Sequence, residues 1–189
     1  MNNINRIVSI IVCVFWMVSC YSQNILSGGI TKYEKCVDLF CLLDSDGLYT
    51  NIPDAENYFV NSNIVLANRE RRQYLRMTHY PGDPMGVMSV FEIGYLSDLD
   101  SCLSYESYDY DGAFLTNNNV SLGELVDNIV KVQGKPARIE EKDGCKIYCY
   151  WVDETNSEYV RENNECAYFI DYWIKDRRLV KLRFGFEYP

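Results

Sequence analysis

The side chains with the most reactive chemistry in this sequence are eight cysteines and a single histidine, His79. A Ser-His-Asp or Cys-His catalytic arrangement would have to use His79 as its base. This histidine lies in the alternating run 72–80, which is typical of a strand, so we interpret it as a structural residue. No G-x-S-x-G motif is present to hold a nucleophilic serine. We therefore predict no catalytic residue.

Metal and cofactor motifs are also missing from the sequence. Cys145-x-x-x-Cys149 departs from the paired C-x-x-C spacing that zinc sites favour. The acidic turns 44–47 and 109–112 resemble fragments of a calcium loop, but each lacks the first aspartate and the final glutamate of that loop. Neither G-x-G-x-x-G nor a P-loop occurs. We expect no metal and no cofactor, and we interpret both acidic segments as turns.

Carboxylates leave one catalytic alternative open. Glycoside hydrolysis needs two of them at a set separation, and the chain has 27 Asp and Glu residues. Their separation depends on the fold, so a small carboxylate-dependent hydrolase stays an alternative.

The cysteines bear on disulfide chemistry. Six are candidates for disulfide bonds: Cys36, Cys41, Cys102, Cys145, Cys149 and Cys166. An even number in an exported chain permits up to three bridges. Cys145 and Cys149 cannot bond each other, because four residues of strand separate their Cα atoms by roughly 13 Å. The alternative is that the cysteines are buried free thiols.

The first 22 residues have the layout of a secretory signal peptide. Arg6 is the only charge, residues 7–18 are almost wholly apolar, and small and polar residues follow. The apolar run is shorter than the roughly twenty residues that cross a bilayer. We expect export, a flexible lead over residues 23–30, and a single domain over residues 31–189.

Two cleavage sites are compatible with this leader. Met17-Val18-Ser19-Cys20 resembles a bacterial lipobox, which would make Cys20 the lipid-bearing first residue. The alternative is ordinary cleavage after Ser22. The first predicts a lipid anchor in the outer membrane, and the second a soluble periplasmic protein.

The charge of the chain excludes one class of partner. The net charge is −9, and loss of Arg6 with the leader would make it −10. An acidic surface repels phosphate backbones, so we expect no nucleic-acid partner and contact with a membrane only through an N-terminal lipid.

The clearest secondary-structure signals lie after residue 70. Alternation and a central Pro-Gly turn predict a β-hairpin over 72–96. Ser121 and Glu124 have capping-box spacing, apolar residues follow at helical intervals, and Gly134 and Pro136 are typical of a helix end. We therefore predict a well-capped helix over 121–133.

Three later segments alternate apolar and polar residues: Cys145–Val152, Cys166–Ile174 and Leu179–Glu187. Such alternation is typical of antiparallel strands with one face on a core. The sequence therefore predicts an α+β domain in which an antiparallel β-meander packs against the 121–133 helix. Residues 30–70 give no clear pattern.

The segments Phe114–Thr116, Val120–Gly123 and Gly134–Pro136 resemble the repeat unit of small outer-membrane assembly lipoproteins and of β-lactamase-inhibitor-like domains. The resemblance covers residues 114–187. It implies a helix that ends at Gly-x-Pro and continues into an antiparallel sheet, and a non-catalytic exported domain that binds other proteins. The first half has no matching capped helix, and no binding residue is carried over.

Tyrosine is the most conspicuous residue type, with 16 copies. Loops rich in Tyr, Ser and Asp form adaptable contact surfaces. The candidate binding loop contains Tyr105, Tyr108, Asp109, Tyr110 and Asp111. We expect a non-catalytic envelope protein that binds another envelope or secreted protein, and the alternative is an inhibitor or immunity-type protein that blocks a hydrolase.

Overall fold

The computed structural model describes residues 29–84, 86–99 and 107–188. The predicted leader and its Cys20, together with Cys102 and Tyr105, lie outside the described residues.

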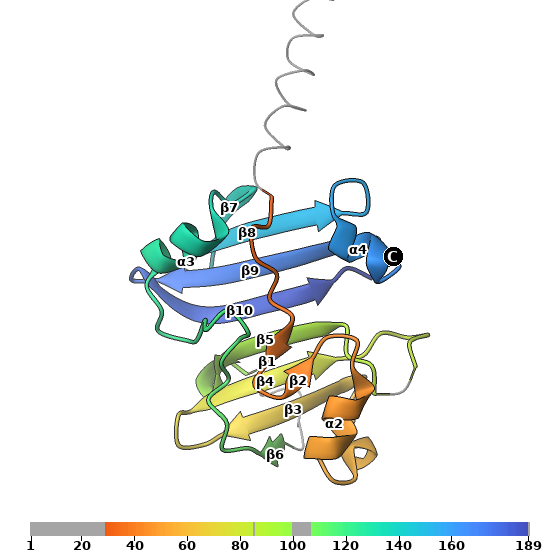
Figure 1. The fold of residues 1–189 in the computed structure, drawn as a ribbon. Coiled ribbons are helices and arrows are strands. Elements are labelled where there is room, and N and C mark those ends of the chain that lie inside the picture. Colours follow the sequence, from red (N-terminus) through yellow and green to blue (C-terminus); the bar gives the residue numbers. More distant parts are fainter. Residues whose placement is uncertain (1–28, 85, 100–106, 189) are drawn as a thin grey trace, which may run out of the picture.

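Eight strands form one sheet in the order β6-β3-β4-β5-β10-β9-β8-β7 (Figure 1). Every neighbouring pair is antiparallel except β3 and β6, which are parallel. The strands are β3 (Asn63–Asn68), β4 (Gln73–Thr78), β5 (Val90–Tyr95), β6 (Ser107–Asp109), β7 (Arg138–Lys142), β8 (Cys145–Asp153), β9 (Ala167–Lys175) and β10 (Arg178–Phe186). The predicted α+β class with an antiparallel sheet is confirmed.

The two halves of the sheet meet where β5 pairs with β10. β4 and β5 form the antiparallel hairpin expected over 72–96. β10 belongs to the meander β7-β8-β9-β10, so this pairing joins strands about ninety positions apart in the chain. Gly185 permits the contact, because a Cβ atom there would lie 2.2 Å from the carbonyl oxygen of Ser89.

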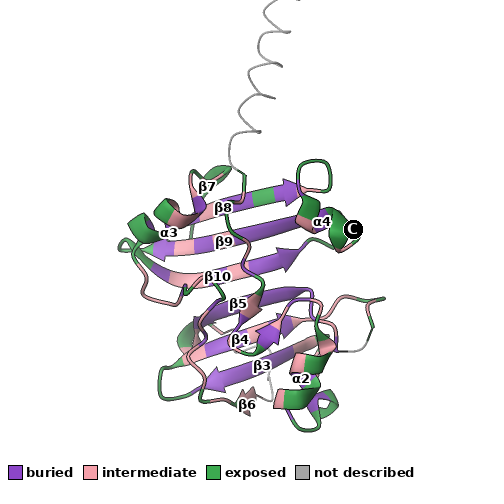
Figure 2. Ribbon diagram, in the orientation of Figure 1, coloured by how far each residue is buried: buried purple, intermediate pink, exposed green. Residues whose placement is uncertain are grey.

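Helices and connecting segments cover one face of the sheet, and the core lies beneath them. Figure 1 shows α2 (Ser45–Asn51), α3 (Val126–Gln133) and residues 29–43 in front of the sheet. Figure 2 shows the strands largely buried. On β9, Tyr168, Ile170 and Tyr172 belong to the core, as their alternation predicts.

Helix α3 begins later than the sequence predicts. It starts at Val126, and its N-cap residue Leu125 provides no side-chain cap, so the expected Ser121–Glu124 capping box is wrong. Leu125 is extended because it pairs with Arg178 at the β9–β10 turn, where Val126 N also donates to Arg177 O at 3.0 Å. The predicted end is right, since Gly134 is the C-cap with φ 83°.

The end of α3 anchors the first described segment of the chain. The Gln133 side chain, 1 % exposed, accepts from Lys32 N at 3.2 Å and donates to Lys32 O at 2.7 Å. Its amide also donates to the Tyr172 hydroxyl at 3.0 Å. Gln133 is thus a buried link between the helix, the sheet and residues 29–35.

Residues 30–60, which gave no clear pattern, form short elements. β1 (Cys36–Val37) and β2 (Phe40–Cys41) make a tight hairpin, and a disulfide joins Cys36 to Cys41. Helix α2 follows, capped by Asp44, whose carboxylate accepts from Asp46 N at 3.0 Å. A 3₁₀ turn at Ala55–Tyr58 then leads into β3.

Three further elements lie outside the helix and the core-facing strands expected from the sequence. The connection between β8 and β9 contains α4 (Glu158–Glu162), which is capped by Ser157. A second 3₁₀ turn, Leu96–Asp98, follows β5. β7 is exposed along its whole length, so it shows none of the alternation that marks a half-buried strand. In the described part of the chain, no helix has the length and hydrophobicity to cross a membrane.

Candidate functional site

The meander strands β7–β10 have one face without a covering helix, which we call the open face. Side chains alternate along a strand, so the residues between the core positions point to this face. They include Cys149 and Trp151 on β8, Phe169 and Asp171 on β9, and Arg183 on β10. α3 lies on the opposite face, where Gln133 contacts Tyr172.

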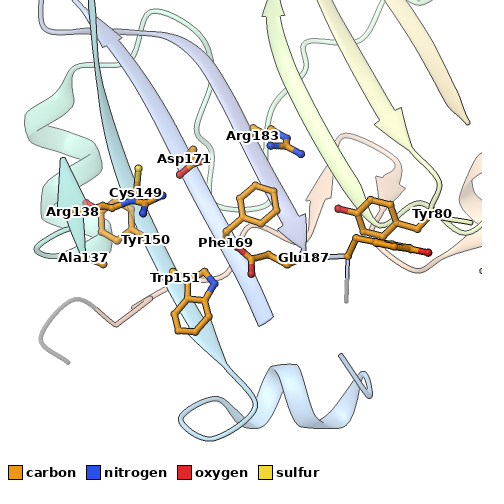
Figure 3. Close-up of a pocket in the computed structure, with 11 residues that line it drawn as sticks. Tyr80, Ala137, Arg138, Cys149, Tyr150, Trp151, Phe169, Asp171, Arg183 and Glu187 are labelled. Carbon is orange, nitrogen blue, oxygen red and sulfur yellow. The ribbon is translucent and has the colours of Figure 1, made fainter. Parts of the chain in front are cut away.

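The open face contains a hollow of about 730 Å³, shown in Figure 3. Strands β8, β9 and β10 supply its floor. Tyr80, which follows β4, and Glu187 and Tyr188, which follow β10, lie at its rim. The lining residues are Tyr80, Ala137, Arg138, Cys149, Tyr150, Trp151, Phe169, Asp171, Arg183, Glu187 and Tyr188. The volume is in the range of small-molecule sites.

A row of charged residues crosses the sheet through this hollow. The strand registers place Arg138 opposite Cys149, Cys149 opposite Asp171, and Asp171 opposite Arg183. The row continues from Arg183 to Glu92 on β5 and from Glu92 to Arg76 on β4. Directly opposite residues lie about 5 Å apart. Apart from the neutral Cys149, positive and negative side chains therefore follow one another at close range along the row.

Glu92 is fully engaged on the side away from the hollow. Glu92 is 5 % exposed, and its carboxylate accepts from the Tyr74 hydroxyl at 2.6 Å and from Arg76 at 2.8 Å. Arg183 forms no ion pair with any residue that the structure describes. Its guanidinium carbon lies 4.9 Å from the centre of the Phe169 ring, a cation–π contact. Arg183 therefore retains its hydrogen-bonding capacity at the edge of the hollow.

Burial controls the ionisation of two floor residues. It raises the pKa of Asp171, although the neighbouring Arg183 and Arg138 both act to lower it. Burial, followed by the nearby Asp171 charge, raises the pKa of Cys149 to about 12. Cys149 is therefore a neutral thiol at physiological pH and lacks the thiolate that a nucleophile needs.

Aromatic side chains form the rim of the hollow. Trp151 is 38 % exposed and Tyr188 is 57 % exposed, which is high for rings of their size. Tyr188 packs edge-on against Tyr80 at 5.1 Å between centroids, and the Tyr80 hydroxyl donates to Phe186 O at 3.0 Å. The rim thus has exposed apolar surface, and the Tyr80 ring, fixed by its hydrogen bond to Phe186 O, supports the ring of Tyr188.

The predicted binding loop does not lie at this hollow. Tyr108 is on β6, at the opposite edge of the sheet, and packs edge-on against Tyr58 at 5.4 Å. Tyr110 packs against Phe40 and Phe114. Asp109 is exposed and pairs with Arg69 at 2.6 Å, and Asp111 is exposed. Tyr108 and Tyr110 are half-buried and packed against other rings, whereas Asp109 and Asp111 are exposed.

The disulfide candidates divide into different states. Cys36 and Cys41 are bonded to each other, whereas Cys145, Cys149 and Cys166 are free thiols. Cys149 faces the hollow, and Cys166 is exposed just before β9.

His79 has a structural environment. Its Nδ1 lies 3.0 Å from the carbonyl oxygen of Val87, and its ring packs against Phe59. Within the described ranges, no group of three or more His, Cys, Asp or Glu side chains is placed to hold a metal ion.

The sequence pattern does not bring the residues of the hollow together. Charged residues at alternate positions of a strand are typical of a solvated face. The only available signal was that aromatic residues, Trp151 and Phe169, alternate with core residues on the same strands.

Comparison of the chain with protein-family models, with curated proteins and with solved structures finds no match.

Proposed function

We propose that this chain is an exported, non-catalytic binding module of the bacterial cell envelope that binds another protein at the hollow of the open face. The observation that carries the proposal is the combination of exposed aromatic rings and charged groups in one concave site on a rigid sheet. Aromatic and arginine side chains dominate the energetics of protein interfaces.

The chemistry of the floor favours binding over catalysis. Cys149 is held as a neutral thiol, and Asp171 lies between arginines in the same row of the sheet. His79 is bonded to a backbone carbonyl on the hairpin. No activated nucleophile–base pair lies among the described lining residues.

The Cys36–Cys41 disulfide supports an exported location. Disulfides persist in oxidising compartments and are rare in the reducing cytosol. Together with the leader sequence, it favours a protein that works in the periplasm or is held to the outer membrane by a lipid on Cys20. The resemblance of residues 114–187 to envelope assembly lipoproteins and inhibitor-like domains points the same way.

The binding test compares capture of envelope proteins by the chain and by variants. Trp151→Ala with Tyr188→Ala removes the exposed rings of the hollow. Leu125→Ala with Tyr49→Ala is the matched control, since these side chains are exposed to a similar extent but lie outside the lining residues. We expect one partner to be retained by the unaltered chain and by the control, and to be lost with the rim variant.

Equal capture by both variants would contradict the assignment of the hollow. Mass spectrometry of the mature N-terminus tests the anchor separately. Acyl chains on Cys20 are the expected result, and a free N-terminus after Ser22 would contradict the lipid anchor.

A second candidate function is inhibition of a hydrolase, and the β1–β2 hairpin favours it. Leu39 at its tip is 60 % exposed, and the disulfide closes the loop beneath it. The Asp38 carboxylate accepts from Phe114 N and Leu115 N, both at 3.0 Å, which fixes the turn. A rigid loop that presents an apolar side chain loses little entropy on entering a pocket.

The inhibitor hypothesis is tested by stoichiometric titration of exported hydrolases with the purified chain. Loss of activity at a one-to-one ratio that Leu39→Asp abolishes would support it. Capture of a partner that has no hydrolytic activity would exclude it.

A further inference from the structure

The hollow has two properties that together define a ligand. One is a guanidinium with no ion pair among the described residues, that of Arg183. The other is an apolar wall formed by the rings of Phe169 and Trp151 on adjacent strands.

We propose that the hollow binds a single carboxylate attached to an aromatic or apolar group, with the carboxylate on Arg183 and the apolar group against Phe169 and Trp151. This inference rests on the proposed function in taking the hollow as the binding site. It adds the chemical group that the partner, or a free small molecule, must present there.

The assignment of the carboxylate follows from how the charged row is engaged. Glu92, the residue opposite Arg183 on β5, already accepts from Tyr74 and Arg76. Arg183 is half-buried and stacked on Phe169, so its head group is held in place and partly withdrawn from water. A planar guanidinium in this setting can donate two parallel hydrogen bonds to a carboxylate.

The acidic groups of the hollow limit the charge of the ligand. Asp171 is next to Arg183 in the row, and Glu187 lies at the end of β10. Two carboxyl groups beside the arginine repel a dianion more strongly than a monoanion. The site therefore favours a carboxylate over a phosphate monoester.

Apolar contact provides the rest of the recognition. Phe169 is 8 % exposed and forms the floor, whereas Trp151 is accessible and stands beside it on β8 (Figure 3). A ring that enters the hollow would stack between them and displace water from both. The volume of about 730 Å³ accommodates one or two residues of a peptide or a small aromatic acid.

Asp171 determines how carboxylate binding at the hollow should change with pH. The charged or titratable groups that face it are Arg183 on β10, Cys149 on β8, and Arg138 and Glu140 on β7, with Glu187 at the rim. Arg138 also pairs with Glu140 at 2.9 Å. As the pH falls, the arginines stay charged and the Cys149 thiol stays neutral. Burial raises the pKa of Asp171, so this carboxyl group takes up a proton at a higher pH than an ordinary aspartate, and the loss of its charge should strengthen carboxylate binding.

The experiment measures binding of defined probes to the purified chain by calorimetry and by NMR. N-acetyl-phenylalanine is the carboxylate probe, its amide is the neutral probe, and phenyl phosphate is the dianionic probe. A peptide ending in phenylalanine, free or amidated, distinguishes a protein C-terminus from a small acid as the natural source. We expect the free acids to bind at least about tenfold more tightly than the amides and phenyl phosphate.

Variants assign the contact to single residues. Arg183→Gln should weaken binding of the acid about tenfold, and Asp171→Asn should strengthen it and remove its pH dependence. Lys181→Gln is the matched control, because Lys181 lies on the same strand and face, two positions away, over Trp173 and outside the lining residues. Circular dichroism confirms that each variant is folded.

Equal binding of acid and amide, or no binding of either, would overturn the inference. So would a loss with Lys181→Gln as large as that with Arg183→Gln, since this would mean attraction by general charge. Capture of a partner protein that depends on Trp151 and Tyr188 would still support the proposed function in each of these cases.

Discussion

The ring of Tyr74 on β4 lies across Gly94 on β5, so that a Cβ atom at Gly94 would lie 2.6 Å from the Tyr74 ring. This contact places the Tyr74 hydroxyl against Glu92, which lies two residues before Gly94 on β5. The hydroxyl donates to Glu92 Oε1 at 2.6 Å. Both side chains are almost wholly buried. The packing of the Tyr74 ring over Gly94 thus holds the Glu92 carboxylate in the position where it pairs with Arg76.

Replacement of Tyr74 by phenylalanine should destabilise the fold. It keeps the ring over Gly94 but leaves a buried Glu92 oxygen without a donor, which costs about 1–3 kcal/mol. Urea denaturation measures the change. Tyr95→Phe is the control, because the Tyr95 hydroxyl has no hydrogen bond to a described residue. An equal loss in both variants would contradict the role of the Tyr74–Glu92 bond.

Glu34→Gln should remove part of the pH dependence of stability. Glu34 is 0 % exposed, one of its carboxylate oxygens has no hydrogen-bond partner among the described residues, and burial raises its pKa above the ordinary 4.5. The folded state therefore retains a proton that the unfolded state releases. The contribution of Glu34 to stability is fully present below its unfolded-state pKa of 4.5 and is lost as the pH rises through its folded-state pKa.

The variant should match the unaltered chain near pH 4 and be more stable than it near pH 8. Denaturation at both pH values gives the difference, which isolates Glu34 from other carboxyl groups with raised pKa values. A variant that is less stable at both would show that the carboxyl group forms a required contact.

Gly185→Ala should disrupt the junction between the halves of the sheet. At φ 148° and with Ser89 O 2.2 Å from the position of a Cβ atom, alanine forces the β5 and β10 backbones apart. We expect a loss on the order of 3 kcal/mol or more, or failure to fold. Gly29→Ala is the control, as nothing lies within 4 Å of its Cβ position, and it should change thermal stability very little.

Reduction of the Cys36–Cys41 bond should lower stability by about 2 kcal/mol, the entropy of closing a short loop. Thermal melts with and without dithiothreitol measure the loss. A Cys36→Ser/Cys41→Ser variant should melt at the lower temperature in both conditions. Sensitivity of that variant to the reductant would assign the effect to other cysteines.

The sheet was predictable from sequence wherever its strands have one buried face. The alternation in Cys166–Ile174 matches β9 within one residue at either end. The start of α3 was not predictable, because Gly123 adopts φ 89° and the residues after it bond to the β9–β10 turn, a partner more than fifty positions away. Local capping chemistry cannot reveal such a bond.

The hollow was hidden for a related reason. Arg138, Asp171 and Arg183 come from three strands, and only the cross-strand register places them in one row. The number of tyrosines in the 105–111 segment predicts a contact surface there, but Tyr108 and Tyr110 pack against other rings. Composition indicated a contact surface, whereas the position of that surface depends on strand pairing.

The pairing of β5 with β10 also bears on how the chain folds. β5 is made early, but its free edge is closed only by a strand that follows it by about ninety residues. Until that strand is in place, the β3-β4-β5 unit presents an unpaired edge, and long-range pairing of this kind is slow. A chain with this strand order keeps a hydrogen-bonding edge accessible to other chains until β10 has been added.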